Sequence, residues 1–172
     1  FFEAGEKPPK LWRSPYRSKL PLVGAARYVP ADYDGAFVLD FGGSYVKSAC
    51  AVYRRSELVA LLCRKRLPAQ YLSEGESKQL FNFMAKTIAE TWRPSYGMEY
   101  RIADVIPVSM AAYIDRDGQP YERQGGTYAG LRTLTDNLQR ALSEAVSDHI
   151  GHSARVVLLH DATAAASAHD CD

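Results

Sequence analysis

The sequence has no long apolar run, few cysteines and none of the common short nucleotide or hydrolase motifs. No stretch approaches the roughly 20 apolar residues of a transmembrane helix, so we expect no membrane association. The patterns GxxxxGK(S/T), GxGxxG and GxSxG are missing, which argues against a P-loop, a Rossmann dinucleotide site and a hydrolase elbow. The three cysteines are widely spaced and odd in number, which predicts a reduced, cytoplasmic protein without a zinc site.

An excess of one charge is also missing, because the 172 residues include 21 basic and 20 acidic ones. A nearly neutral body argues against nucleic-acid binding, which needs a concentrated basic face. Residues 1–30 differ from the rest, with six basic residues, two acidic residues and five of the nine prolines. Because proline fixes φ and removes a backbone donor, we expect a proline-rich basic arm without regular structure over 1–30. A proline-rich ligand for a partner domain is the alternative.

From residue 31 onward, apolar patterns predict strands and helices in the order β-β-β-α-β-α-β-α. The first three runs are separated by short turns, which is typical of an antiparallel β-meander. The expected strands are 36–41, 45–53, 58–67, 101–108 and 155–160. The expected helices are 77–92, 131–150 and 162–169. This order predicts an α/β domain with a mixed five-stranded sheet.

The first candidate site is Asp40-Phe41-Gly42-Gly43-Ser44, between the first two strands. Because Gly42 and Gly43 lack a Cβ, their backbone amides can approach a ligand closely and form an anion site suited to phosphate. We expect Asp40 to hold Mg²⁺ through water, Ser44 to add a hydroxyl and Lys47 to place a cation near the phosphates. An ordinary hairpin turn is the alternative. A protein-kinase interpretation of Asp-Phe-Gly fails, because no His-Arg-Asp loop or glycine-rich lid accompanies it.

Asp161 is the second candidate, because it stands where a buried strand gives way to a helix. The carboxyl ends of the strands are where α/β sheets bind ligands. A carboxylate in that position can accept the proton of an attacking hydroxyl during phosphoryl transfer. The alternative is a helix N-cap, a role that Asp often fills.

Taken together, the two motifs resemble the N-terminal domain of the actin/hexokinase/heat-shock-70 superfamily, and most of all its ROK and hexokinase sugar kinases. Asp40-x-Gly42-Gly43-Ser44 with Lys47 is similar to the first phosphate loop of those kinases, usually Asp-x-Gly-Gly-Thr followed by Lys or Arg. The segment 158–165 is similar to the one in which an Asn-Asp pair supplies the catalytic base. His160 stands in place of that Asn, and 106–110 replaces a glycine- and proline-rich sugar-binding loop. Both departures concern the substrate.

The resemblance implies a ribonuclease-H-like (actin-like ATPase) domain that uses ATP and Mg²⁺ to phosphorylate a sugar or polyol hydroxyl. Asp161 would be the catalytic base. The implied ATP and Mg²⁺ residues are Asp40, Gly42, Gly43, Ser44 and Lys47. The implied substrate residues are His160, Asp161 and Ser109.

The resemblance further implies that residues 31–172 are the N-terminal lobe of a two-lobe kinase whose C-terminal lobe is missing. We expect this lobe to be inactive alone, and a homo-oligomer is a further expected assembly. One alternative is a regulatory or filament-forming actin-like protein that binds nucleotide without phosphorylating a sugar. The other is an interaction module that kept only the fold, since a fold does not determine a function.

Overall fold

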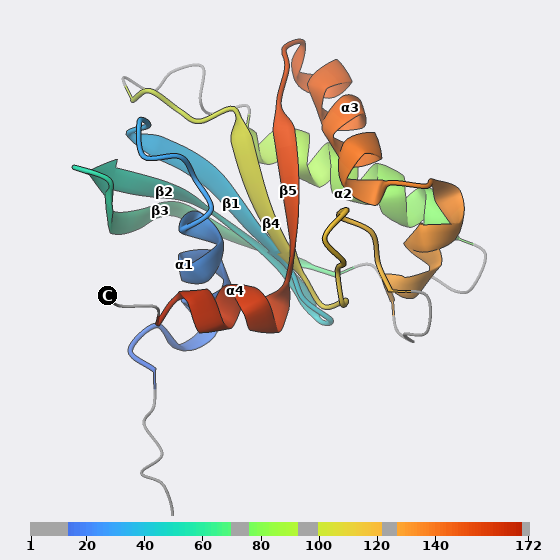
Figure 1. The fold of residues 1–172 in the computed structure, drawn as a ribbon, viewed down its shortest axis with the longest axis horizontal. Helices are drawn as coiled ribbons and strands as arrows, with labels where there is room; N and C mark the ends of the chain where they lie inside the picture. The colour runs from blue at the N-terminus through green and yellow to red at the C-terminus, as the bar shows by residue number, and fades with distance from the viewer. Residues whose placement is uncertain (1–13, 70–75, 93–99, 122–126, 170–172) are drawn as a thin grey trace, which may run out of the picture.

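The computed structural model describes residues 14–69, 76–92, 100–121 and 127–169. These residues form a five-stranded sheet in the order β3-β2-β1-β4-β5, with helices on both faces (Figure 1). The strands are β1 (Gly35–Phe41), β2 (Tyr45–Arg54), β3 (Glu57–Pro68), β4 (Val105–Met110) and β5 (Arg155–His160). The helices are α1 (Leu20–Ala26), α2 (Ser77–Trp92), α3 (Leu138–Ile150) and α4 (Asp161–Ser167), with short 3-10 helices η1 (Arg17–Lys19) and η3 (Ala129–Leu134).

The strand directions make the sheet mixed. Strands β1, β2 and β3 form an antiparallel meander, whereas β4 runs parallel to β1 and β5 runs parallel to β4. The α/β fold class, the mixed five-stranded sheet and the β-meander predicted from the sequence are therefore confirmed.

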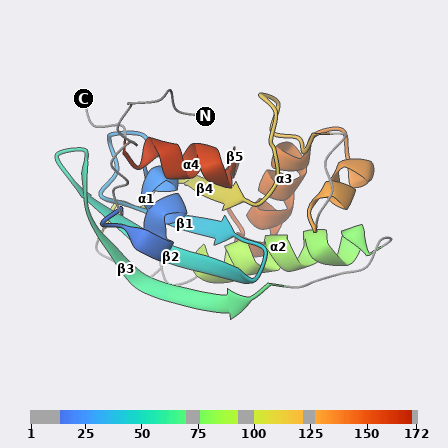
Figure 2. The same ribbon diagram turned by 90° about the horizontal axis from the view of Figure 1, so that it is seen from below.

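The side chains of β1 alternate between two hydrophobic cores, because successive residues of a strand point to opposite faces. Phe37, Leu39 and Phe41 pack in the larger core, which α2 and α3 complete. Val38 packs in the smaller core, which α1 and α4 complete. Figure 2 shows the sheet between these two helix layers. All seven residues of β1 are buried, as expected for a central strand covered on both faces.

Residues 20–26 are a correction to the predicted arm without regular structure. They form α1. Pro21 is compatible with this helix because it lies in the first turn, where a backbone N–H has no intrahelical partner. Helix α1 packs so closely on α4 that a Cβ added at Gly24 would overlap the carbonyl oxygen of Ala164. The basic, proline-rich segment therefore contributes a packed helix. Residues 1–13 of the expected arm lie outside the described residues, and the lobe assigned to 31–172 stays a prediction.

The helix predicted over 131–150 is interrupted near its start. Asn137 caps α3, and its Oδ1 accepts a hydrogen bond from the backbone N–H of Arg140 at 2.7 Å. Thr135 before it is extended, and Ala129–Leu134 forms the separate 3-10 helix η3. The apolar pattern runs through both helices, so periodicity alone did not reveal the break. Gly151 ends α3 at a φ of 77°, the left-handed conformation that glycine favours.

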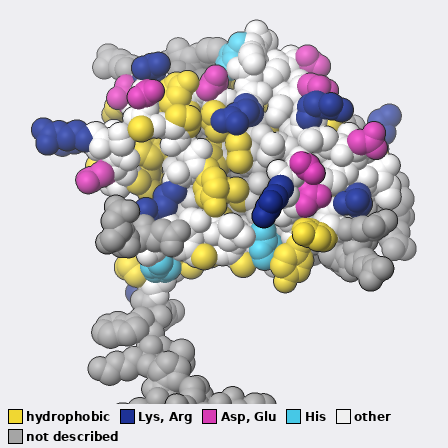
Figure 3. Space-filling view, in the orientation of Figure 1, with side chains coloured by type: hydrophobic (Ala, Val, Ile, Leu, Met, Phe, Trp, Pro, Cys, Tyr) yellow, Lys and Arg dark blue, Asp and Glu magenta, His cyan; other side chains and the backbone are white. Residues whose placement is uncertain are grey.

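The surface in Figure 3 carries acidic and basic side chains interspersed with small apolar patches. This face therefore has no single-sign field. Within the four described segments, we find no helix with the length and apolar character needed to cross a membrane.

Candidate functional site

Three polar side chains lie side by side near the end of β1. In the strand register, Asp40 pairs with Lys47 of β2 on one side and Ser109 of β4 on the other. Lys47 Nζ donates to Asp40 Oδ2 at 2.7 Å, and Ser109 Oγ donates to Asp40 Oδ1 at 2.9 Å. The Asp40 side chain is only 3% exposed. A carboxylate so deeply buried is costly unless it is paired, and Lys47 and Ser109 supply the partners that offset this cost.

The loop Gly42–Ser44 forms a closed hairpin turn. The Gly42 N–H donates to the carbonyl of Tyr45 at 3.0 Å, and the Gly42 carbonyl accepts from the Tyr128 hydroxyl at 3.1 Å. Because the Gly42 amide is already used, it does not face a phosphate in this conformation. Gly43 is exposed, and a Cβ added there would meet nothing within 4 Å. The hairpin alternative therefore describes this loop well, and its predicted phosphate contact stays a prediction.

Asp161 is the first residue of α4, directly after β5. Its Oδ1 lies 3.2 Å from His160 Nε2, and its side chain is 39% exposed. The ring of Tyr113 stacks on the His160 ring with centroids 4.3 Å apart. The N-cap interpretation of Asp161 is not supported, because His160 occupies that position and makes no side-chain cap bond. Asp161 is thus an accessible carboxylate whose orientation is set by a histidine.

The two candidate motifs meet at one edge of the sheet. Phe41 at the end of β1 pairs with Met110 at the end of β4, which in turn pairs with His160 at the end of β5. Neighbouring strands are about 5 Å apart, so Asp161 starts about 10 Å from the end of β1. Both motifs therefore lie at the edge where α/β sheets bind ligands.

Ser109 differs from its expected role. It is fully buried, and its hydroxyl donates to Asp40. It therefore supports Asp40, and its predicted contact with a substrate has no basis in this conformation.

Sequence reasoning missed Tyr113, which is 60% exposed beside His160. The only signal for it is an aromatic residue shortly after a buried strand.

The site offers a magnesium ion one carboxylate, which phosphates and water would have to complete. Mg²⁺ is often held by one or two carboxylates, waters and substrate phosphates. Asp40 supplies one such carboxylate, and both of its oxygens have partners within the protein. No group of three or more metal-binding side chains occurs among the residues that the structure describes. Binding would therefore need a phosphate as a further ligand and some release of Lys47 from Asp40.

Comparison with known proteins extends the description of the fold. No family model matches the chain, and no curated protein matches it. Similar solved structures include a ROK family transcriptional regulator, a homolog of the E. coli MLC protein, with a TM-score of 0.49 and 12% identity over 72% of this chain. Others are the inorganic polyphosphate/ATP-glucomannokinase from Arthrobacter sp. strain KM (TM-score 0.47, 16% identity, 74% of this chain) and the ethanolamine utilization protein EutJ from Carboxydothermus hydrogenoformans (TM-score 0.42, 14% identity, 86% of this chain).

These structures share at most 16% sequence identity with this chain. The chain spans 27%, 44% and 52% of the three proteins, in the order given. The similarity concerns the fold alone. The neighbours comprise a regulator and a kinase, so the function has to be argued from the site.

Proposed function

We propose that this chain is the N-terminal lobe of a two-lobe kinase that transfers the γ-phosphate of ATP to a hydroxyl of a sugar or polyol. The observation that best supports this proposal is that Asp40 and Asp161 lie at the same edge of the sheet. Asp40 is buried and paired, whereas Asp161 is accessible. Two carboxylates in such different environments suit two different roles, one in charge balance near phosphate and one in proton transfer.

Asp161 is the proposed general base, which accepts the proton of the attacking hydroxyl. His160 lies within hydrogen-bonding reach of Asp161 Oδ1, which orients the carboxylate and leaves Oδ2 for the substrate. The exposed ring of Tyr113 provides an apolar wall beside it. Lys47 would turn from Asp40 toward the phosphates, and Gly43 and Ser44 would contact them from the hairpin. Bound ATP with Mg²⁺ supplies the phosphoryl group and partial neutralisation of its charge.

The test is turnover of MgATP by a protein that carries both lobes, with a panel of hexoses, pentoses and polyols as acceptors. Asp161→Asn removes the proton acceptor but keeps the size of the side chain. We expect kcat to fall about 10²- to 10⁴-fold while nucleotide binding is retained. Asp148→Asn, an exposed carboxylate of α3, is the matched control and should leave kcat unchanged. Full turnover by Asp161→Asn with every acceptor would show that the proposal is wrong.

A second candidate is a nucleotide-binding regulatory or filament-forming protein without transfer activity. One observation favours it: both oxygens of Asp40 and the amide of Gly42 are engaged within the protein. A site closed in this way could respond to nucleotide by a change of shape alone. ATP binding without turnover of any acceptor, together with ATP-dependent polymerisation seen by light scattering, would support this candidate.

A further inference from the structure

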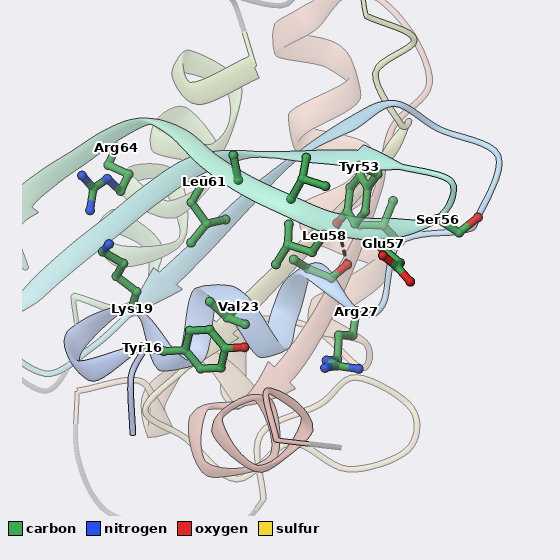
Figure 4. A pocket seen from close by; sticks show the side chains of 14 residues that line it. Tyr16, Lys19, Val23, Arg27, Tyr53, Ser56, Glu57, Leu58, Leu61 and Arg64 are labelled. Carbon is green, nitrogen blue, oxygen red and sulfur yellow. Dashed lines mark hydrogen bonds between the residues drawn. The ribbon is translucent and has the colours of Figure 1, made fainter. Parts of the chain in front are cut away.

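A groove of about 900 Å³ lies between α1 and the β2–β3 hairpin, on the smaller-core face of the sheet. Figure 4 shows Lys19 and Arg64 at one end of the groove and Arg27 at the other. The hairpin turn at Ser56 is at the sheet edge opposite to the Gly42–Ser44 turn, because β2 connects the two. The groove is thus separate from the candidate active site.

The floor of the groove is apolar and rigid. Leu58 and Leu61 of β3 are half-buried and face Val23 of α1 (Figure 4). The Tyr53 hydroxyl donates to the carbonyl of Ala26 at 2.5 Å, which ties the hairpin to α1. Burial raises the pKa of Tyr53, so this hydroxyl keeps its proton, and the hydrogen bond, throughout the physiological pH range. The floor therefore presents apolar side chains between two elements that a hydrogen bond holds together.

The rim of the groove carries three basic side chains and one acidic side chain, Glu57. Within the described part of the chain, Lys19, Arg27 and Arg64 have no carboxylate within the 4.0 Å that defines an ion pair. The charged residues that line the groove are thus three basic ones and one acidic one. This local excess of positive charge attracts an anionic partner.

The shape of the groove decides which anionic partner fits. Single-stranded nucleic acid needs exposed aromatic rings for base stacking, whereas this floor is mainly aliphatic. A membrane surface contacts protruding apolar side chains, whereas these side chains lie at the bottom of a hollow. A peptide segment fits both the apolar floor and the basic side chains of the rim, because it can place apolar side chains on the floor and carboxylates on the rim.

We propose that the groove binds an acidic segment of a partner protein, with apolar side chains between its acidic residues. Lys19 and Arg27 are eight residues apart along the η1–α1 segment, which corresponds to about 12 Å at the rise of a helix. An extended peptide covers that length with about four residues. The segment should therefore carry two Asp or Glu residues three to five positions apart, with at least one large apolar residue between them. This proposal does not depend on the kinase activity.

The test is selection of binders from a random dodecapeptide library displayed on phage, with the 172-residue chain immobilised. The best peptides are then synthesised with a fluorescent label and measured by anisotropy. Lys19→Glu/Arg64→Glu reverses the charge of two exposed side chains at one end of the groove. Lys78→Glu, an exposed residue of α2 on the opposite face of the sheet, is the matched control. Circular dichroism confirms that each variant is folded.

We expect the selected peptides to share the acidic–apolar–acidic pattern. Their binding should weaken at least tenfold in Lys19→Glu/Arg64→Glu and at high salt, and should be unchanged in Lys78→Glu. Failure to enrich any peptide, enrichment of peptides without acidic residues, or equal binding by the double variant would overturn the proposal. A labelled 20-nucleotide RNA or a phosphatidylserine vesicle that binds through Lys19 and Arg64, when no peptide does, would also overturn it.

Discussion

The ion pair between Lys47 and Asp40 should contribute strongly to the stability of the fold, and a double-mutant cycle can measure it. Lys47→Met keeps the length of the side chain but removes the charge, so the buried carboxylate of Asp40 retains only Ser109 as a side-chain partner among the described residues. Breaking a buried ion pair by removing one partner costs about 3–5 kcal/mol. We expect about 3 kcal/mol, because 27% of the Lys47 side chain is exposed and water can reach the site.

The second variant of the cycle is Asp40→Asn, and the third combines it with Lys47→Met. The combined variant has no buried charge, so it should lose only about 1 kcal/mol, the net value of a typical hydrogen bond. The coupling between the two residues is then about 2 kcal/mol or more, within the range seen for residues in contact. Urea unfolding followed by circular dichroism gives the free energy of each variant.

Glu144→Gln provides a matched control, because it breaks the Arg140–Glu144 pair, whose side chains are 70% and 71% exposed. Such a pair is worth about 0.3–0.5 kcal/mol, so the loss should be correspondingly small. If Lys47→Met costs no more than this control, or if the combined variant loses as much as Lys47→Met, the carboxylate of Asp40 does not depend on Lys47. The account of a closed, charge-balanced site would then be refuted.

Three further predictions follow from local contacts. Gly24→Ala should destabilise the protein by about 3 kcal/mol, because its Cβ would force α1 away from α4. Gly43→Ala is the control: its Cβ lies in open space, so the stability should change by no more than about 0.5 kcal/mol. Equal urea midpoints for the two variants would contradict this prediction. Asn137→Ala removes the cap of α3 and should cost about 1 kcal/mol, also measured by urea unfolding, with Asn137→Ser restoring most of the loss. Burial raises the pKa of the Cys50 thiol to about 11, from an ordinary 9.0, so iodoacetamide at pH 8.5 should label exposed Cys63 and spare Cys50, as peptide mass spectrometry can show. Because the folded protein keeps this proton longer than the unfolded chain, the stability contribution is complete below about pH 9 and is lost as the pH rises toward 11.

The sequence predicted most of the elements, but it missed one helix and one helix break. It also placed the fourth strand at 101–108, whereas β4 is Val105–Met110. The helix over Leu20–Ala26 was hidden by Pro21, because the sequence does not tell a proline in the first turn of a helix from one in an arm without regular structure. The break before Asn137 was hidden by apolar residues that continue on both sides of it. In both places tertiary packing, or a single side-chain cap, overrode the local pattern.

For the candidate site, the sequence identified Asp40 and Asp161 as residues of interest but not their environments. The ion pair with Lys47 depends on the register of β1 against β2, and the bond from Ser109 depends on the register of β1 against β4. Register is determined by contacts between segments far apart in the chain. The stacking of Tyr113 on His160 likewise joins the residues after β4 to the end of β5.

The amino-acid sequence by itself determined the order of strands and helices from residue 31 onward, because hydrophobic periodicity and glycine or proline breaks act over a few residues. Only the tertiary structure decided which charges meet. Packing α1 against the β2–β3 hairpin brings Lys19, Arg27 and Arg64 to one groove, although the chain as a whole is nearly neutral. The same folding buries Asp40 beside Lys47 and leaves Asp161 accessible. Charge counts along a chain carry no information about distance in space, and electrostatic interaction depends on that distance.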